Sequence, residues 1–576
     1  MTFPNPLADP RPRRRLLAKA IGIPLFLFLF CLAPRAWMAV RLESICPDGV
    51  FYIQKAEHLL HHDQPHASSP LYDLNVFPVV LSWLYRAGLD WETAARVWGV
   101  FASSLAVLPL FGWVRRMFDD RIAVLACLLY GAQPKLIEWS PEFVREPTFW
   151  LLMTTAIFCT WRAVTEVRIP WFIAAGIATF LAANTRLEGW FLLVPFALWI
   201  LWRWWALEQA RWQLAGGAVA FLACYPLVLA MLVNVYGYER WEWGSIGRMT
   251  KAREWATSFF ACGASATNRA ATTTPAASTP MTSVVMDAAD SDAPSDANRT
   301  EAMRAKAMRV TCVAMEKWGR AFSPAFGVLV LLGTLRWWRV WIGRDHAALL
   351  IYTLITAAAI WLHASVTMAS STRYVMPLVI LSTPCAALGL MLICRTIASV
   401  INRIAPRASV VPYTMASLLL VAVIIAGNVD ALSSNMDDRA AKADLGRWIR
   451  ETSGANRVVV GSASWQSPIA YHAGAQYHAI AGPCISNRSD AAKRLRTLCQ
   501  EQRPDFVVLC RYHEAEWLDR LVQTAGECGA QAIDPMRLPL RCRDQVVVLT
   551  ARKPNTTAAG THTAGLPKKP AGGKPN

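Results

Sequence analysis

Long apolar runs recur along the chain between residues 21 and 430. They are Ile21–Val40, Trp91–Trp113, Ile122–Ile137, Thr148–Val164, Trp171–Asn184, Trp190–Trp205, Leu214–Val235, Phe322–Val340, Ala347–His363, Tyr374–Ile393 and Val410–Ile425. Most approach the length of about 20 residues that an α-helix needs to cross a bilayer. The chain is 54% hydrophobic and only 17% charged, which is too apolar for an ordinary soluble protein. These runs predict an α-helical polytopic membrane protein with about 11 transmembrane helices.

Arginines gather in the connections on one side of these runs. They are Arg115, Arg116, Arg121, Arg162, Arg168, Arg203, Arg211, Arg336, Arg339, Arg344, Arg395, Arg403 and Arg407. Placing them in the cytoplasm satisfies the positive-inside rule. Residues 1–20 then form a basic cytoplasmic N-terminus. No small-residue cleavage site follows the first run, so we interpret it as an uncleaved helix rather than a cleaved signal peptide. The prediction is a multi-pass protein of the plasma (inner) membrane with an extracytoplasmic C-terminal region.

The net charge of +18 has the same origin, because basic residues cluster at the ends of apolar runs. Such clusters indicate topology and contact with anionic membrane lipids. No basic face interleaved with aromatic residues suggests a nucleic-acid partner. The 14 cysteines form no Cys-x-x-Cys pair and no zinc-binding pattern with histidine.

Two regions interrupt or follow the membrane domain, which we place at residues 21–430. The outer loop 236–323 has a middle rich in Ala, Thr, Ser, Pro and Asp, which predicts partial disorder. Its flanks show helical periodicity. A disulfide between Cys262 and Cys312 across this middle is an open alternative in an oxidising compartment.

The composition turns soluble after the last run. Helix-like segments alternate there with the strand-like segments RVVVGS, DFVVLC and RDQVVVLTA, which predicts a small extracytoplasmic α/β domain at residues 437–553. No glycine-rich phosphate loop follows a strand, so no nucleotide site is predicted. Residues 554–576, rich in Gly, Pro, Thr and Lys, form a disordered tail.

A lone acid, Asp48, follows the first run at the outer membrane boundary. The residues after it have helical spacing, with Tyr52, Ala56 and Leu59 on the apolar face and Lys55 off it. A helix N-terminus keeps such a carboxylate ionised, ready for proton abstraction or metal binding. The alternative, favoured on spacing alone, is that Asp48 only caps the helix.

Further charged residues lie at the outer ends of runs. The segment SPEFVREP holds Glu142, Arg145 and Glu146, and later boundaries carry Arg186 and Arg373 beside Tyr374. Charges at a membrane boundary are costly unless they are hydrated, paired or functional. Three converging arginines would bind an anionic lipid headgroup, since guanidinium pairs bidentately with phosphate. The alternatives are a solvated turn for SPEFVREP and snorkelling for each arginine.

Two weaker features complete the survey. Residues His58, His61, His62 and His66 have partly helical spacing, but no acid partner is evident, so a metal site is disfavoured. The segment NVFPVVLSWLYRAG is too short for a full crossing and is typical of a re-entrant or interfacial helix.

Taken together, these landmarks resemble the GT-C superfamily of polytopic glycosyltransferases, particularly its bacterial RgtA/B/C/D-like and protein-mannosyltransferase-like groups. The resemblance covers roughly residues 15–430. It rests on Asp48 with Tyr52, Ala56 and Leu59; Pro70–Tyr72 and PVVLSWLYRAG; Ala94–Val97; RRMF with Arg121; Ser140–Glu142; Arg145–Pro147; Thr185–Gly189; and Arg373 with Tyr374. Each motif is weak alone, but their order and sidedness make the set fairly specific.

The resemblance implies sugar transfer from a polyprenyl-phosphate carrier to an acceptor at the outer membrane face. By position, Asp48 matches the general base or a metal-binding acid, and Glu146 and Glu142 match a second acidic position. Arg145, Arg186 and Arg373, with Tyr374, would bind the donor phosphate. The resemblance leaves the need for a divalent metal ion open. Protein mannosyltransferases carry Asp-Glu where this chain has Asp48-Gly49. This departure favours the wider bacterial group, whose acceptors are often lipids or glycans.

The predicted function is therefore an integral membrane glycosyltransferase, transferring a hexose or pentose to a lipid, glycan or protein. A transporter or flippase of lipid-linked glycans would use the same arginines without needing a base. A non-catalytic scaffold for the outer domain would need neither the arginines nor a base. The sugar, the acceptor, the carrier length, the role of the C-terminal domain and the oligomeric state are left open by the sequence.

Overall fold

The computed structural model describes residues 10–61, 74–236, 308, 311–312, 315–341, 347–367, 371–404, 419, 422, 436–463, 466–481, 488–510 and 515–550. The chain divides into two compact units. The helical unit comprises Met1–Leu42 and Phe51–Ser434, and the α/β unit comprises Glu43–Val50 and Asn435–Asn576. The predicted run Val410–Ile425, the middle of the outer loop with Cys262, Pro70–Tyr72 and the tail 554–576 lie outside the described residues, apart from two isolated positions in that run.

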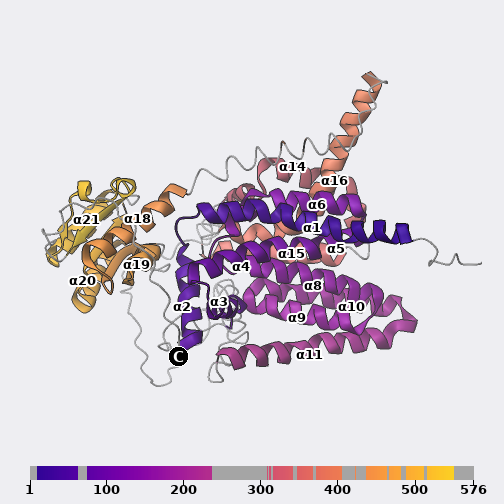
Figure 1. The fold of residues 1–576 in the computed structure, drawn as a ribbon, viewed down its shortest axis with the longest axis horizontal. Helices are drawn as coiled ribbons and strands as arrows, with labels where there is room; N and C mark the ends of the chain where they lie inside the picture. Colours follow the sequence, from indigo (N-terminus) through magenta and orange to yellow (C-terminus); the bar gives the residue numbers. More distant parts are fainter. Residues whose placement is uncertain are drawn as a thin grey trace, which may run out of the picture. The chain divides into compact units, whose positions relative to one another are not determined.

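The helical unit consists of helices that follow the predicted apolar runs. They are α1 (Pro10–Arg41), α2 (Pro47–His61, whose first turn belongs to the α/β unit), α3 (Val76–Arg86), α4 (Trp91–Leu105), α5 (Val107–Met117), α6 (Asp120–Ala132), α7 (Pro134–Trp139), α8 (Glu146–Glu166), α9 (Ile169–Thr185), η1 (Leu187–Leu192), α10 (Leu193–Ala206), η2 (Glu208–Ala210), α11 (Arg211–Tyr236), α14 (Pro324–Trp341), α15 (Ala347–Thr367) and α16 (Thr372–Ile404). Neighbouring helices such as α8, α9 and α11 run side by side (Figure 1).

Several of these helices are long and apolar enough to span a membrane. Among the described residues, five pass on length and composition: Ile21–Arg41, Trp91–Met117, Leu187–Ala206, Arg211–Tyr236 and Thr372–Ile401. A sixth arises if the pair Met315–Phe322 and Pro324–Arg336, bent by 93°, is one span. The expected α-helical, multi-pass membrane protein is confirmed. The figure of about 11 spans stays a prediction.

Local sequence signals set where several helices begin. Asn75, Asp90 and Asp119 cap α3, α4 and α6, each side chain accepting a hydrogen bond from a backbone N–H two or three residues on, at 2.8–3.0 Å. The run Ile122–Ile137 is split between α6 and α7 at Gln133, because the following Pro134 has no N–H to continue the first helix. The short helix α3 rises only about 16 Å, as expected for a segment that does not cross alone.

Small residues let the helices pack closely. A Cβ atom at Gly333 of α14 would overlap the backbone oxygen of Cys385 on α16, and one at Gly389 would overlap that of Leu329. Membrane helices commonly approach through such small residues. Between the helices, Trp113 and Trp150 are completely buried.

The α/β unit is a five-stranded mixed sheet covered by helices. Its strands, β1 (Val458–Ala463), β2 (Gln476–Ala481), β3 (Phe506–Cys510), β4 (Gln531–Ala532) and β5 (Val546–Thr550), lie in the order β2-β1-β3-β5-β4. Strand β1 pairs in parallel with β2 and β3, whereas β5 is antiparallel to β3 and β4. Its helices are α18 (Met436–Ser453), α19 (Ser467–Ala473), α20 (Arg488–Gln502) and α21 (Ala515–Glu527), with short turns η5 (Pro535–Arg537) and η6 (Leu540–Cys542).

Strand β3 shows why this unit folds as two layers of helices around a sheet. Phe506, Val508 and Cys510 pack into one core with residues of α18 and α19. Val507 and Leu509 pack into the opposite core with residues of α20 and α21. Successive strand side chains point to opposite faces, so a strand that is apolar throughout must be covered on both. The expected α/β region is confirmed.

Candidate functional site

Helix ends far apart in the sequence bring four charged residues together in the helical unit. Glu146 is the first residue of α8, and Arg186 follows the end of α9. Glu188 lies in the first turn of η1, and Arg373 lies in the first turn of α16. We call these four residues the ion-pair cluster. The Nη1 atom of Arg186 donates to Oε1 of Glu146, and Nε of Arg373 lies 3.7 Å from the same oxygen. One carboxylate therefore holds two guanidinium groups.

The carboxylate of Glu188 pairs with the remaining nitrogens of Arg186. Nε of Arg186 donates to Oε2 of Glu188 at 3.1 Å, and Nη2 of Arg186 donates to Oε1 of Glu188. The tight 3-10 turn of η1 returns Glu188 to the guanidinium only two residues after Arg186. The side chain of Arg186 is 2% exposed and that of Glu146 is 3% exposed. Buried charges require such pairing, and two carboxylates here balance two guanidinium groups.

Aromatic rings support the cluster. The guanidinium of Arg186 lies 5.1 Å from the ring centre of Tyr374 and 5.9 Å from that of Phe149. The guanidinium of Arg373 lies 5.4 Å from the same Tyr374 ring. A cation over an aromatic face is stabilised electrostatically, so Tyr374 helps to keep two like charges close together.

This geometry separates the roles of the predicted phosphate ligands. Nε, Nη1 and Nη2 of Arg186 all have carboxylate partners, which favours a structural role for that guanidinium. Arg373, at 20% exposure, is the most accessible of the four cluster side chains. Arg145 precedes α8 and is half-buried. Glu146 bridges two arginines, an arrangement that suits an anchor better than a proton acceptor.

A buried arginine of α1 holds the segment that leads into Glu146. Arg35 is fully buried, and its Nε donates to the Ser140 hydroxyl at 3.1 Å. Its other nitrogens donate to the backbone oxygens of Cys31, Gly131 and Tyr130 at 2.9–3.4 Å. The segment also packs so closely on α4 that a Cβ at Gly99 would overlap the Ser140 oxygen. Glu142, two residues later, is fully buried.

Asp48 lies in the first turn of α2, within the stretch Glu43–Val50 that belongs to the α/β unit. The helix begins at Pro47, so Asp48 is inside the helix, and its predicted alternative as an N-cap residue is wrong. Its carboxylate still lies at the positive end of the helix dipole. The side chain is half-buried.

Three residues that the sequence analysis did not assign belong to these arrangements. Arg35 is signalled by its position inside an apolar run, where a charge is rarely accidental. Glu188 lies in the charged interruption TRLEG, but its pairing with Arg186 required the fold. Lys55 was expected off the apolar face, yet it is 3% exposed and lies 5.4 Å from the ring centre of Tyr236. That expectation was wrong because Tyr236, far along the chain, covers this face.

The described residues do not assemble a metal site. No group of three His, Cys, Asp or Glu side chains in this part of the chain has the proximity to hold an ion. His58 is half-buried on α2, while His62, His66 and the side chain of His61 lie outside the described residues. The need for a divalent metal ion stays a prediction, and the mechanism proposed below uses none.

Comparisons with known proteins agree with this architecture. Residues 77–229 match the family model of dolichyl-phosphate-mannose-protein mannosyltransferases. The structure is similar to that of ArnT from Cupriavidus metallidurans bound to undecaprenyl phosphate, with a TM-score of 0.50 and 14% identity over 93% of this chain and 99% of that one. The chain has a GT-C fold.

Two archaeal structures share this GT-C fold. The oligosaccharyltransferase of Archaeoglobus fulgidus in complex with zinc and sulfate has a TM-score of 0.50 and 14% identity, covering 85% of this chain and 68% of that one. AglB from the same organism, with an inhibitory peptide and a dolichol-phosphate, has a TM-score of 0.51 and 13% identity, covering 89% and 73%. A comparison with curated protein sequences finds no match. The resemblance to the GT-C superfamily of membrane glycosyltransferases is confirmed.

Proposed function

We propose that this protein transfers a sugar from a polyprenyl-phosphate-linked donor to a lipid, glycan or protein acceptor at the outer face of the plasma (inner) membrane. The observation that carries the proposal is the ion-pair cluster, in which Glu146 holds Arg373 and Arg186 at neighbouring helix ends of a GT-C fold. The solved relatives support the donor class, because ArnT was crystallised with undecaprenyl phosphate and AglB with a dolichol-phosphate.

The chemistry assigns different tasks to the two arginines. Breaking the bond between sugar and phosphate places negative charge on the departing polyprenyl phosphate, and the sugar acquires oxocarbenium character. Arg373, the more accessible guanidinium, stabilises that charge, assisted by Arg145 at the start of α8. Arg186 and Glu146 hold Arg373 and Tyr374 in place. Their pairing is made before the donor arrives, so it costs no reorganisation during the reaction.

Asp48 supplies the base in this proposal. Its carboxylate, in the first turn of α2, accepts the proton of the acceptor hydroxyl. The acceptor oxygen attacks the anomeric carbon, the bond from that carbon to the phosphate oxygen breaks, and the phosphate leaves with the electron pair. Glu142, buried near the start of α8, contributes to the local negative potential but is assigned no proton transfer.

The test compares three variants with the wild type after reconstitution in lipid nanodiscs. The donor probe is a pool of polyprenyl-phosphate-linked sugars extracted from bacterial membranes, and the readouts are released polyprenyl phosphate and donor binding. Asp48→Asn is expected to lose turnover by about a hundredfold or more while retaining donor binding. Arg373→Gln is expected to lose turnover and also weaken inhibition by free polyprenyl phosphate.

Arg162→Gln is the matched control, because Arg162 is 22% exposed, close to Arg373, and pairs with Glu166 at the end of α8 opposite to Glu146. It is expected to behave as the wild type. Unchanged turnover in Asp48→Asn would remove its role as base. If the protein moves lipid-linked glycans between leaflets without releasing sugar, it is a transporter and not a transferase. If it shows no activity and binds no polyprenyl phosphate, it is a scaffold.

A further inference from the structure

The stretch that carries Asp48 folds as part of the α/β unit. Residues Glu43–Val50 form one compact unit with Asn435–Asn576, although they lie far apart in the sequence. Ser44 and Ile45 in this stretch are buried, and Pro47 begins α2. The C-terminal sheet and helices therefore hold the turn from which Asp48 projects.

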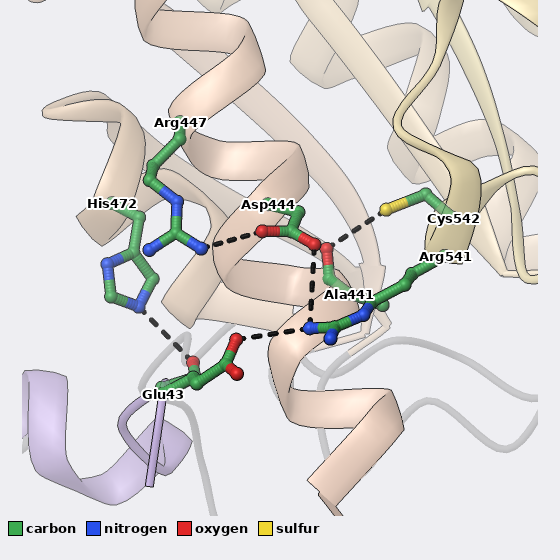
Figure 2. Close-up of polar contacts among 8 residues, drawn as sticks. Glu43, Ala441, Asp444, Arg447, His472, Arg541 and Cys542 are labelled. Atoms are coloured by element: carbon green, nitrogen blue, oxygen red, sulfur yellow. Dashed lines mark hydrogen bonds and ion pairs between the residues drawn. The ribbon is translucent and has the colours of Figure 1, made fainter. Parts of the chain in front are cut away.

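An arginine of η6 pairs with an acid in this stretch. Nη1 of Arg541 lies 3.1 Å from Oε2 of Glu43 and 3.8 Å from Oδ2 of Asp444 on α18 (Figure 2). The other oxygen of Asp444 accepts a hydrogen bond from Arg447 at 2.6 Å. Arg541 thus links Glu43 to a carboxylate that α18 already holds in place.

Two further contacts make this link well defined. The Ser44 hydroxyl lies 3.2 Å from Nε2 of His472 on α19, and Ser44 is fully buried. The thiol of Cys542, next to Arg541, donates to the backbone oxygen of Ala441 at 3.0 Å, which fixes η6 on α18 (Figure 2). Adjacent residues Glu43 and Ser44 are therefore held by two different elements of the α/β unit.

We propose that Arg541, acting through Glu43, is a positioning residue for Asp48 and that this is the task of the α/β unit in sugar transfer. The inference rests on the proposed function. Asp48 follows Ser44 by four residues within a turn and the start of a helix, so restraining Glu43 and Ser44 restrains where α2 begins. Releasing the restraint lets the carboxylate explore positions from which it cannot reach the acceptor proton.

The test is a mutant cycle on turnover. Arg541→Gln and Glu43→Gln are each expected to lower kcat about tenfold with KM unchanged, because a misplacement of about 1 Å can cost up to about a hundredfold. The double variant is expected to be no slower than either single variant, since both break the same contact. Arg541→Lys, which keeps the charge, is expected to retain most of the turnover.

A matched control separates positioning from a general effect on the α/β unit. Arg496 on α20 pairs with Glu527 on α21 at 2.7 Å, at an exposure close to that of the Glu43–Arg541 pair. Arg496→Gln should therefore match the wild type in kcat. Adding Arg541→Gln to Asp48→Asn should cause no further loss, because the base that Arg541 positions is already absent. A further loss there would show that Arg541 acts otherwise and overturn the inference.

Hydrogen exchange supplies a readout that needs no activity. The backbone amides of residues 43–50 should exchange several-fold faster in Arg541→Gln than in the wild type or Arg496→Gln, with exchange in β1 and β3 unchanged. Equal exchange at residues 43–50 overturns the inference whatever the reaction is. If Asp48→Asn retains turnover, the assigned base fails instead. If Asp48→Asn is inactive while Arg541→Gln turns over normally, only the positioning role fails.

Discussion

Arg186 and Glu146 form a buried ion pair that joins the end of α9 to the beginning of α8. The two residues are 40 positions apart, and each lies at a helix terminus rather than within a helix. Glu188 and Arg373 add one charge of each sign, so the cluster is neutral as a whole. A neutral and largely buried group of mutually paired charges holds its geometry with little help from solvent.

Replacing Glu146 by glutamine should destabilise the helical unit. The variant leaves two guanidinium groups with the single carboxylate of Glu188, and breaking a buried pair costs about 3 kcal/mol or more. The measurement is the thermal unfolding midpoint in detergent, followed by tryptophan fluorescence. Glu92→Gln is the control, because its half-exposed pair with Arg96 contributes about 1 kcal/mol or less. Equal midpoints for the two variants would contradict the structural role of the cluster.

Arg35→Met should destabilise the protein by about 3 kcal/mol, because hydrogen bonds to a charged group contribute about 1.5–3 kcal/mol each and the partners stay buried. The variant removes the donor that the Ser140 hydroxyl and three backbone oxygens share. Arg41→Met, which removes an exposed arginine stacked 4.1 Å from the Trp37 ring centre, is the control. Thermal unfolding of the two variants decides the matter, and a loss at Arg35 no larger than at Arg41 would refute the expectation.

Asp90→Ala should cost about 1 kcal/mol through loss of the α4 cap, while Asp90→Asn should cost less at neutral pH. The hydrogen bond from Thr93 holds the pKa of Asp90 below its ordinary value of 3.8. Its ionised form therefore adds stability above that value, and this contribution is lost as the pH falls toward the lowered pKa. Unfolding midpoints of wild type and Asp90→Asn should converge as the pH falls below 3.8 and through the lowered pKa. A gap that is independent of pH would count against this assignment.

His478 should make the α/β unit less stable in acid. Burial, and then the positive charge of Arg494, lower the pKa of His478 below its ordinary value of 6.5. The folded unit thus binds fewer protons than the unfolded chain, so its stability falls as the pH drops below 6.5 and through the lowered pKa. His478→Gln should flatten this dependence. Proteolysis of the α/β unit at pH 7.5 and 5.0 measures it, and an unchanged acid sensitivity in the variant would exclude His478 as its source.

The sequence predicted the helices well because length and apolarity are local properties. The run Thr148–Val164 became α8, and Leu214–Val235 became α11, each to within a few residues. Two helix starts follow local sequence rules, since Asp90 and Pro147 lie where such residues usually start a helix. The strands DFVVLC and RDQVVVLTA were likewise predicted from apolar runs bounded by polar residues.

The contact partners of these side chains could not be predicted in the same way. Arg186 could be recognised as a charged residue at a helix end, but its two carboxylates depend on how α8, α9 and η1 pack. Lys55 was assigned to the wrong face because its covering ring, Tyr236, comes from a distant helix. The count of spans likewise needs more than length, since the described residues contain five or six helices that pass on length and apolarity.

The sequence by itself determined the membrane class, the helix positions and the α/β character of the C-terminal region, because each follows from local hydrophobic patterns. Only the tertiary structure decided that Arg186 lies between Glu146 and Glu188, that β5 runs antiparallel to β3, and that Glu43 meets Arg541. These pairings join residues distant in sequence. Their free energies depend on burial and distance, which exist only once the chain has folded.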